Sequence, residues 1–109
     1  MTDILQVTTT VSSKEEAERI GRTLVEDRLA ACAQIVGPIA SHYRWLDRLE
    51  STSEWYCQLK TTTERYPTLE ARLRALHSYD VPEIIAVPLV RVGAEYAAWV
   101  ADAVRLQQS

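Results

Sequence analysis

The chain is poor in the residue types on which several common functions depend. It has no Phe, three isolated glycines and only two lysines, Lys14 and Lys60, and its net charge is −3. Phosphate backbones are bound by clustered Lys and Arg, so this composition argues against nucleic acid as a partner. The glycines are too far apart to form a phosphate-binding loop, and the nucleophile-elbow and zinc-protease motifs are missing. These absences favour a protein without enzymatic activity.

Long apolar runs and paired cysteines are also absent. No stretch approaches the roughly 18 apolar residues of a membrane span, and residues 1–5 lack the basic and apolar regions of a secretory signal. We therefore expect a cytoplasmic protein without a membrane partner. Cys32 and Cys57 form no CxxC motif. In the cytosol we expect them to be buried, small apolar residues, with a metal or redox role as the alternative.

The residues that are present predict one domain spanning 1–109, built from alternating strands and helices. Apolar residues make up 47% of the chain and charged residues 25%, as in ordinary globular proteins. Hydrophobic periodicity predicts strands at 4–11, 29–45, 54–63 and 84–90, with a turn at 46–51. Helices are expected at 14–28, from 64–67 to His77, and after Gly93. Ser12 and Glu15 suit a capping box for the first helix.

Two interruptions of this pattern carry structural information. The pair Gly37-Pro38 falls inside an apolar segment, which indicates a bulge or bend within one long strand. Pro88 cannot donate to a strand ladder, so the last strand should lie at a sheet edge.

The order of elements predicts an α+β fold. Strand, helix, two strands, helix, strand is the ferredoxin-like, or split βαβ, order of an antiparallel sheet, here with one additional C-terminal helix. The hairpin between the second and third strands is long compared with strands of about five or six residues. A long apolar hairpin and a sheet face that the helices leave bare both favour assembly of several copies.

The segment His77–Ile85 is the strongest candidate for a site. It places an imidazole, a phenol and two carboxylates at a junction between a helix and a strand. His77 is either a cation at a helix end or a metal ligand or proton donor beside Tyr79, Asp80 and Glu83. Lys60 is either a surface residue or a cation that faces Glu83 or an anionic ligand. Tyr and Trp suit interfaces and pockets.

These residues resemble the CutA1 family of divalent-cation tolerance proteins. The matching motifs are Arg28-Leu29-Ala30-Ala31-Cys32-Ala33, Tyr43-Arg44-Trp45, Leu59-Lys60-Thr61 and His77-Ser78-Tyr79-Asp80-Val81-Pro82-Glu83-Ile84, followed by Tyr96 and Trp99. The resemblance implies a PII-like homotrimer in the cytoplasm, with clefts between subunits and a role in tolerance of copper or other divalent cations. It implies no established reaction and no required cofactor.

The resemblance also assigns candidate residues. His77 is the main candidate metal ligand, and Cys32 or Cys57 is the candidate for a second ligand. Thr8 and Leu76 stand where metal-binding members have Cys and a second His, and Thr is a poor ligand for soft metals. We therefore expect weak or incidental metal binding.

Two alternatives to metal tolerance remain open from the sequence. The first is a PII-like module that binds a small anionic molecule through Lys60, Tyr79, Glu83 and Trp99. The second is an enzyme that uses His77 as acid or base, for which no nucleophile or oxyanion donor can be named.

Overall fold

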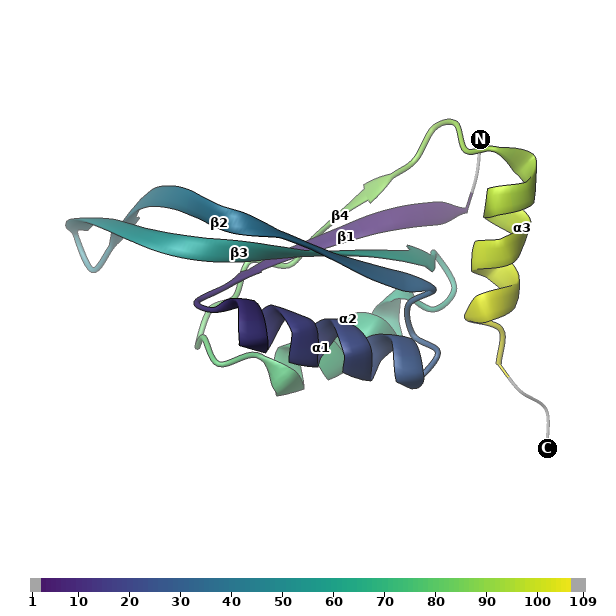
Figure 1. Ribbon diagram of the computed structural model, residues 1–109, viewed down its shortest axis with the longest axis horizontal. Coiled ribbons are helices and arrows are strands. Elements are labelled where there is room, and N and C mark those ends of the chain that lie inside the picture. Colours follow the sequence, from purple (N-terminus) through teal and green to yellow (C-terminus); the bar gives the residue numbers. More distant parts are fainter. Residues whose placement is uncertain (1–2, 107–109) are drawn as a thin grey trace.

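The computed structural model describes residues 3–106, and these form the elements of a ferredoxin-like fold (Figure 1). In chain order they are β1 (Ile4–Val11), α1 (Lys14–Glu26), β2 (Cys32–Trp45), β3 (Arg48–Thr62), α2 (Tyr66–Leu76), β4 (Ile85–Pro88) and α3 (Ala94–Ala103). The strands make one antiparallel sheet in the order β2-β3-β1-β4. The predicted fold class is confirmed, and β4 with Pro88 lies at an edge as expected.

The hairpin of β2 and β3 extends well past the rest of the sheet. The pairing of β1 with β3 ends at Val11 opposite Trp55, whereas β2 and β3 stay paired as far as Trp45 opposite Arg48. We call residues 39–54 the hairpin arm. The predicted bulge is confirmed, because the register of β2 shifts between Val36 and Ile39, around Gly37-Pro38.

The tip of the hairpin arm corrects the predicted turn. A turn was expected over residues 46–51, but only Leu46 and Asp47 connect the strands, and residues 48–51 belong to β3. Both turn residues have positive φ, 51° and 62°. This is the pattern of a two-residue type I′ turn, whose twist matches that of the strands. The Asn-Gly signature of such turns is absent here, so the pattern was not recognised.

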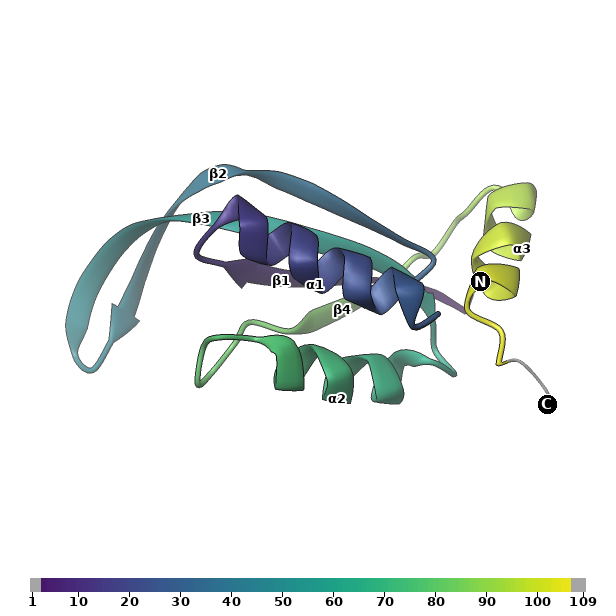
Figure 2. The same ribbon diagram turned by 60° about the horizontal axis from the view of Figure 1, so that its bottom comes forward.

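One face of the sheet carries the core. Figure 2 shows α1 and α2 side by side against this face. Alternate strand residues such as Val7, Val11 and Leu59 pack there against the buried helix residues Leu24 and Leu69. Burial of this apolar surface is the main stabilising contribution to the fold.

The close contact of α1 with the sheet depends on a glycine. A Cβ at Gly21 would lie 2.7 Å from the Cβ of Ala33, so only glycine permits this approach.

The helix α1 starts at Lys14 as predicted, but its capping residue and its C-terminal end differ from the prediction. The N-cap is Ser13, whose Oγ accepts from the Glu16 N–H at 3.1 Å, and not Ser12 with Glu15. The helix ends at Glu26, because Arg28 adopts φ 58° and reverses the chain. The next strand starts at Cys32 and not at residue 29, since the N–H groups of residues 29 and 30 donate to the Leu24 carbonyl.

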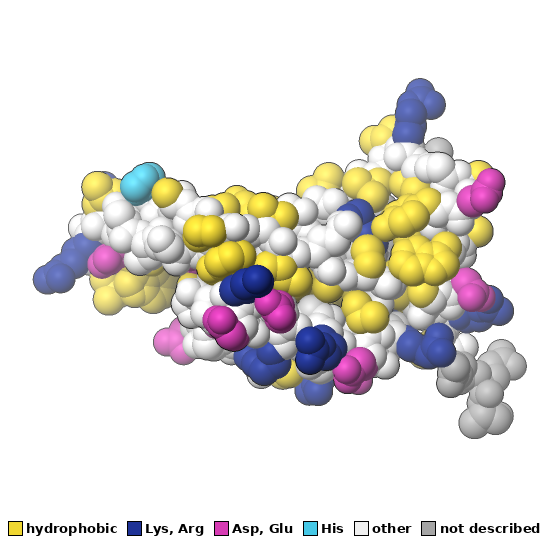
Figure 3. Space-filling model, in the orientation of Figure 1, with side chains coloured by type: hydrophobic (Ala, Val, Ile, Leu, Met, Phe, Trp, Pro, Cys, Tyr) yellow, Lys and Arg dark blue, Asp and Glu magenta, His cyan; other side chains and the backbone are white. Residues whose placement is uncertain are grey.

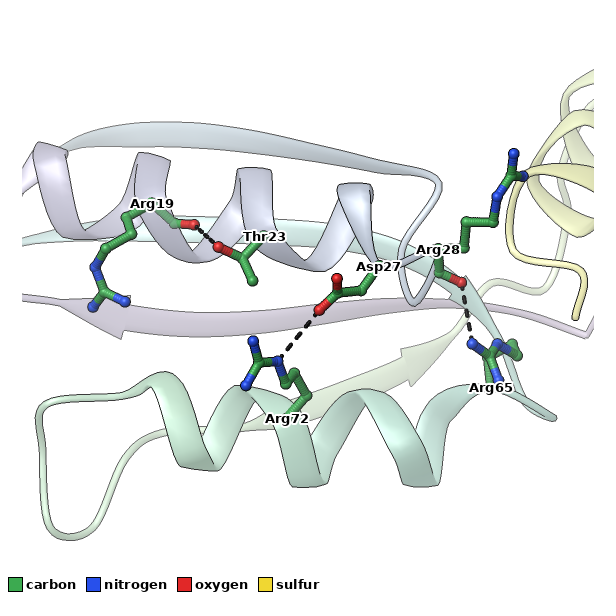
Figure 4. A network of polar contacts seen from close by, with 6 residues as sticks. All are labelled: Arg19, Thr23, Asp27, Arg28, Arg65 and Arg72. Carbon is green, nitrogen blue, oxygen red and sulfur yellow. Dashed lines mark hydrogen bonds and ion pairs between the residues drawn. The ribbon is translucent and has the colours of Figure 1, made fainter. Parts of the chain in front are cut away.

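Polar contacts join the C-terminal end of α1 to α2. In Figure 4 the Asp27 carboxylate at the end of α1 accepts from Arg72 of α2 at 3.3 Å. The Arg65 side chain donates to the Arg28 carbonyl at 3.4 Å. The ion pair is exposed, so it orients the helices and adds little stability.

The helix α3 stands at the end of the sheet away from the hairpin tip (Figures 1 and 2). It forms a second, smaller apolar cluster in which Val100 and Val104 pack with Ile4 and Ala31. Several of its neighbours remain at the surface, and Figure 3 shows apolar side chains gathered over this end of the molecule. No helix within residues 3–106 is long and apolar enough to span a membrane.

Candidate functional site

The loop that follows α2 is fixed to β1 by the imidazole of His77. Its Nε2 lies 3.0 Å from both the Thr10 carbonyl oxygen and the Thr9 Oγ1. Its Nδ1 accepts from the Tyr79 backbone N–H at 3.1 Å. An acceptor at Nδ1 and a carbonyl at Nε2 together define a neutral ring with the proton on Nε2. His77 is the C-cap of α2, so the predicted helix end is confirmed, but its ring anchors the loop as a neutral group and not as the expected cation.

The next aromatic residue connects this loop to the hairpin arm. The Tyr79 hydroxyl donates to Oε2 of Glu54 at 2.8 Å, and the Tyr79 ring lies against His77 with centroids 4.9 Å apart. Glu54 is only 7% exposed. Burial raises the pKa of Tyr79, and the hydrogen bond to Glu54 and its negative charge raise it further. The phenol therefore keeps its proton at neutral pH and donates it to the Glu54 carboxylate.

A concave site of about 650 Å³ opens between the hairpin arm and this loop. We call it the arm cavity. Its acidic lining consists of Glu50 and Glu54 from β3 and Asp80 and Glu83 from the loop. Aromatic rings of Tyr43, Trp45 and Tyr79 also line it, together with His42. None of the described residues that line it is Lys or Arg, so the cavity is acidic and aromatic.

A second group of polar side chains lies near α3. The Cys32 Sγ is 3.5 Å from the Tyr96 hydroxyl, and the Tyr96 ring lies 5.5 Å from that of Trp99. Lys60 is the cross-strand partner of Cys32, and its Nζ donates to Oε1 of Gln34 at 3.1 Å. The contact with Cys32, and then burial, raise the pKa of Tyr96 to about 12. We call these residues the α3 cluster.

The four residues of the predicted cleft thus fall into two groups within one chain. Tyr79 and Glu83 line the arm cavity, whereas Lys60 and Trp99 belong to the α3 cluster. A cleft that combines both groups needs more than one subunit, and it stays a prediction. The binding of a small anion by these four residues likewise stays a prediction.

The two candidate metal ligands are also far apart in the chain. Cys32 is level with Gln6, since both are paired with Lys60, whereas His77 contacts β1 at Thr9 and Thr10. Three residues along β1 correspond to about 10 Å, and β2 is two strands away from β1.

Neither the ring of His77 nor its surroundings suit a tight metal centre. Both of its ring nitrogens already take part in hydrogen bonds within the chain. Among residues 3–106, no group of three or more His, Cys, Asp or Glu is placed to hold a metal ion. The donors of one chain therefore do not fit a resident copper centre, and His77 and Cys32 as separate, weak ligands remain a prediction.

The two cysteines differ from each other. Cys57 lies in the core with no exposed surface, and burial raises its pKa to about 12. Its predicted burial is confirmed. Cys32 is only partly buried and contacts Tyr96, so the same prediction is wrong for Cys32.

Glu54 is the site residue that sequence reasoning missed. It was read only as the start of a strand, and its partner Tyr79 lies 25 positions away. The available signal was a carboxylate in an aromatic strand segment, Glu54-Trp55-Tyr56, where a buried charge requires a partner.

These features define a class: small α+β proteins with a ferredoxin-like sheet, an extended hairpin and an additional C-terminal helix. Within that class the chain belongs to the CutA1 family, because residues 5–103 match the family described as "CutA1 divalent ion tolerance protein".

Relatives and solved structures agree with this assignment. The chain is 44% identical over 93 residues to the divalent-cation tolerance protein CutA of Thermus thermophilus, covering 85% of this chain and 90% of the relative. CutA of Archaeoglobus fulgidus is 38% identical over 95 residues, with 87% and 92% covered. The crystal structure of CutA from Xylella fastidiosa superposes with a TM-score of 0.92 at 35% identity, covering 95% of this chain and all of that one.

Proposed function

We propose that this protein acts in tolerance of divalent cations such as copper, as a cytoplasmic homotrimer without enzymatic activity. The observation that carries the proposal is the match of nearly the whole chain, in sequence and in fold, to proteins named for divalent-cation tolerance. The metal is cargo that the protein meets at elevated concentration and is not a resident cofactor.

The donors in the chain support weak rather than tight metal binding. The partly exposed Cys32 thiol is a soft ligand, and the carboxylates of the arm cavity are hard ones. They are not assembled into one coordination sphere. Loose coordination by one or two donors gives low affinity and fast exchange, which suits a protein that responds to excess metal.

The hairpin arm supports the proposed assembly. It exposes large apolar side chains, among them Tyr43 and Trp45, along strands that extend beyond the sheet. Strands of this kind are prone to pair with other chains unless a specific partner covers them. A closed trimer would cover them without leaving open edges.

The tolerance role is tested in a bacterial strain that lacks its own gene of this family. We expect the wild-type chain to restore growth at elevated Cu²⁺, with no effect at low metal. Cys32→Ser should reduce this rescue, whereas Cys57→Ser serves as the thiol control at a buried position. Failure of the wild-type chain to change metal sensitivity, while it is expressed and folded, would overturn the proposal.

The assembly and the metal affinity are tested on the purified protein. Sedimentation should give one species of about three times the chain mass of 12.3 kDa. Titration with Cu²⁺, followed by Trp fluorescence, should give weak, saturable quenching that Cys32→Ser reduces. A stable monomer would contradict the trimer, and tight stoichiometric binding would contradict the weak site.

A further inference from the structure

A second concave site lies at the end of the sheet away from the hairpin tip, where α3 stands beside the end of β3 and the start of α2 (Figures 1 and 2). We call it the strand-end groove. Its volume of about 780 Å³ is within the range of small-molecule sites. Its apolar wall is formed by Ala97, Ala98, Ala101 and Val104. Its charged residues are Asp3, Glu64, Arg65 and Arg105.

The groove is separate from the surfaces that the proposed assembly uses. The hairpin arm lies at the opposite end of the sheet (Figure 1). On α3, Ala97, Ala101 and Val104 follow helical spacing and share one flank, whereas Tyr96 and Trp99 lie on the other. Neither the arm nor this aromatic flank lines the groove. Covering the arm alone therefore leaves the groove open to solvent.

Arg65 has fewer hydrogen bonds than its side chain can make. A guanidinium group carries five N–H donors. Among residues 3–106, the Arg65 side chain makes one hydrogen bond, of 3.4 Å to the Arg28 carbonyl, and forms no ion pair. Its Nε is buried and has no acceptor. A buried donor without an acceptor is costly, so this guanidinium lacks an acceptor that a bound carboxylate would supply.

The start of α2 adds positive potential beside this guanidinium. Arg65 occupies the N-cap of the helix, no side chain caps that end, and no acidic residue lies in the first turn. The free N–H groups and the dipole at a helix start favour a negatively charged group. The helix start and Arg65 thus both favour an anionic group at this side of the groove.

The groove also carries two carboxylates, which would repel a simple anion such as phosphate. Asp3 is held in place by Thr63, whose backbone N–H and hydroxyl donate to the Asp3 carbonyl at 2.9 and 3.2 Å. Neither Asp3 nor Glu64 forms an ion pair among residues 3–106, whereas Arg105 pairs with the nearby Asp102. The lining therefore offers one unpaired guanidinium and two unpaired carboxylates.

Charges of both signs that do not neutralise each other suit a ligand that carries both. We propose that the strand-end groove binds a free α-amino acid with an apolar side chain, in its zwitterionic form. Its carboxylate lies at Arg65 and the start of α2, and its ammonium group lies at Asp3 and Glu64. The wall of small α3 residues leaves room for its apolar side chain. This site is independent of the divalent-cation role and stands whether or not that role is confirmed.

The test compares L-leucine with two analogues that each lack one of its charges. Isocaproate lacks the ammonium group, and isoamylamine lacks the carboxylate. Binding to the full-length protein is measured by calorimetry and by the shifts of the Ala98 and Ala101 methyl signals in NMR. We expect saturable binding of leucine and about tenfold or more weaker binding of each analogue, because each loses charge-assisted hydrogen bonds.

Two variants and a control locate the site. Arg65→Gln removes the guanidinium and should weaken leucine binding about tenfold or more. Ala101→Leu fills the groove from an exposed position without a change of charge, and it should abolish binding even where Arg65→Gln proves unstable. Arg74→Gln removes the same charge from an exposed position of α2 outside the groove, and it should leave the affinity within about twofold.

Several results would overturn the proposal. Equal weakening by Arg74→Gln would mean that leucine responds only to net charge. Isocaproate or isoamylamine binding as tightly as leucine would mean that the groove recognises a single charge. Unchanged binding in Ala101→Leu would place the ligand elsewhere. Absence of leucine binding would refute the site outright, and altered sedimentation of Ala101→Leu would then identify the groove as a contact between copies of the chain.

Discussion

The helix-covered face of the sheet and the arm cavity treat polar groups in opposite ways. Under α1 and α2 the buried residues are almost all apolar, and the buried Thr61 hydroxyl donates to the Leu29 carbonyl at 2.7 Å. In the arm cavity the Glu54 carboxylate accepts from the neutral Tyr79 hydroxyl and forms no ion pair among residues 3–106. The first region is closed by packing within one chain, whereas the second leaves aromatic side chains such as Tyr43 and Trp45 exposed.

This contrast separates stability from function along the chain. The helices that cover this face have apolar residues at regular helical spacing, and these residues form a close-packed core that stabilises the fold. The hairpin arm extends past β1 and exposes aromatic and apolar side chains, which a monomer gains nothing by displaying. We infer that partner subunits are to be sought along the arm and not in the core.

The two thiols give the largest expected contrast between a covered and an open position. Burial raises the pKa of Cys57 to about 12, so at pH 8 only about one molecule in ten thousand is thiolate, the reactive form. An unfolded cysteine near pKa 8.5 is about one quarter thiolate, a difference above a thousandfold. With a thiol reagent at pH 8 we expect one reactive thiol per native chain, and Cys32→Ser should abolish this reaction.

The sign of the pH effect follows from the same shift. Since the folded chain holds the Cys57 proton more tightly than the unfolded chain, the stability linked to this proton is complete below the unfolded pKa and decreases as the pH rises towards 12. Rapid labelling of native Cys32→Ser would contradict the closed core at Cys57.

A core truncation compared with an arm truncation gives the next largest effect. Leu69→Ala removes a fully buried side chain of α2, and we expect a loss of about 2–5 kcal/mol in the free energy of unfolding by urea. Leu49→Ala removes a side chain that is 73% exposed on the arm, and it should cost less than about 0.5 kcal/mol.

Both leucine variants are measured at the same protein concentration, because assembly makes apparent stability concentration-dependent. An equal loss for both would contradict the distinction and would place Leu49 in a buried interface.

The fold was predictable from the sequence because its signals are local. The stripe of Ala17, Ile20 and Leu24 and the alternation in Ile4–Val11 each specify one element, and their order specifies the sheet. At the tip of the arm the sequence predicted a turn but not its two-residue length, because Leu46-Asp47 is not the Asn-Gly pair typical of such turns and takes positive φ between the paired strands.

The site was predictable only in part, for a different reason. The segment after α2 was identified by its composition, and Tyr79 and Glu83 do line a cavity. Glu54 lies in β3, 25 positions before Tyr79 in the sequence. A hydrogen bond between two such distant residues produces no periodic pattern in the sequence. Tertiary pairing of polar groups has no period, so the sequence could not assign the partners of His77 either.

Removing the Tyr79 hydroxyl tests how the loop is held to the arm. Tyr79→Phe leaves the ring but deprives the buried Glu54 of its donor, and we expect a loss of about 1–3 kcal/mol at pH 7. Tyr96→Phe, which removes an exposed contact to Cys32, should cost less than about 0.5 kcal/mol.

The wild-type protein should also lose stability at strongly alkaline pH through this group. Burial raises the pKa of Tyr79 above that of an unfolded tyrosine, so its contribution is complete below the unfolded pKa near 10 and is lost as pH rises through the folded value. Tyr79→Phe should show a shallower decline above pH 10 in urea unfolding. An unchanged slope would mean that Tyr79 does not titrate with unfolding.

The smallest effect is expected at the tip of the arm, where a substitution should stabilise. Leu46 is 81% exposed and adopts φ 51°, a conformation that costs a branched side chain about 1 kcal/mol. Asn tolerates this region, so Leu46→Asn should raise the free energy of unfolding by about 0.5 kcal/mol. Leu46→Ala removes the same apolar surface but keeps a residue that disfavours positive φ, and it should bring no gain.

If the two variants stabilise equally, the cause is loss of exposed apolar surface and not relief of the backbone. A loss of stability in both variants would mean that Leu46 is packed against another copy of the chain. The tip of the arm would then be part of a buried interface and not an exposed turn.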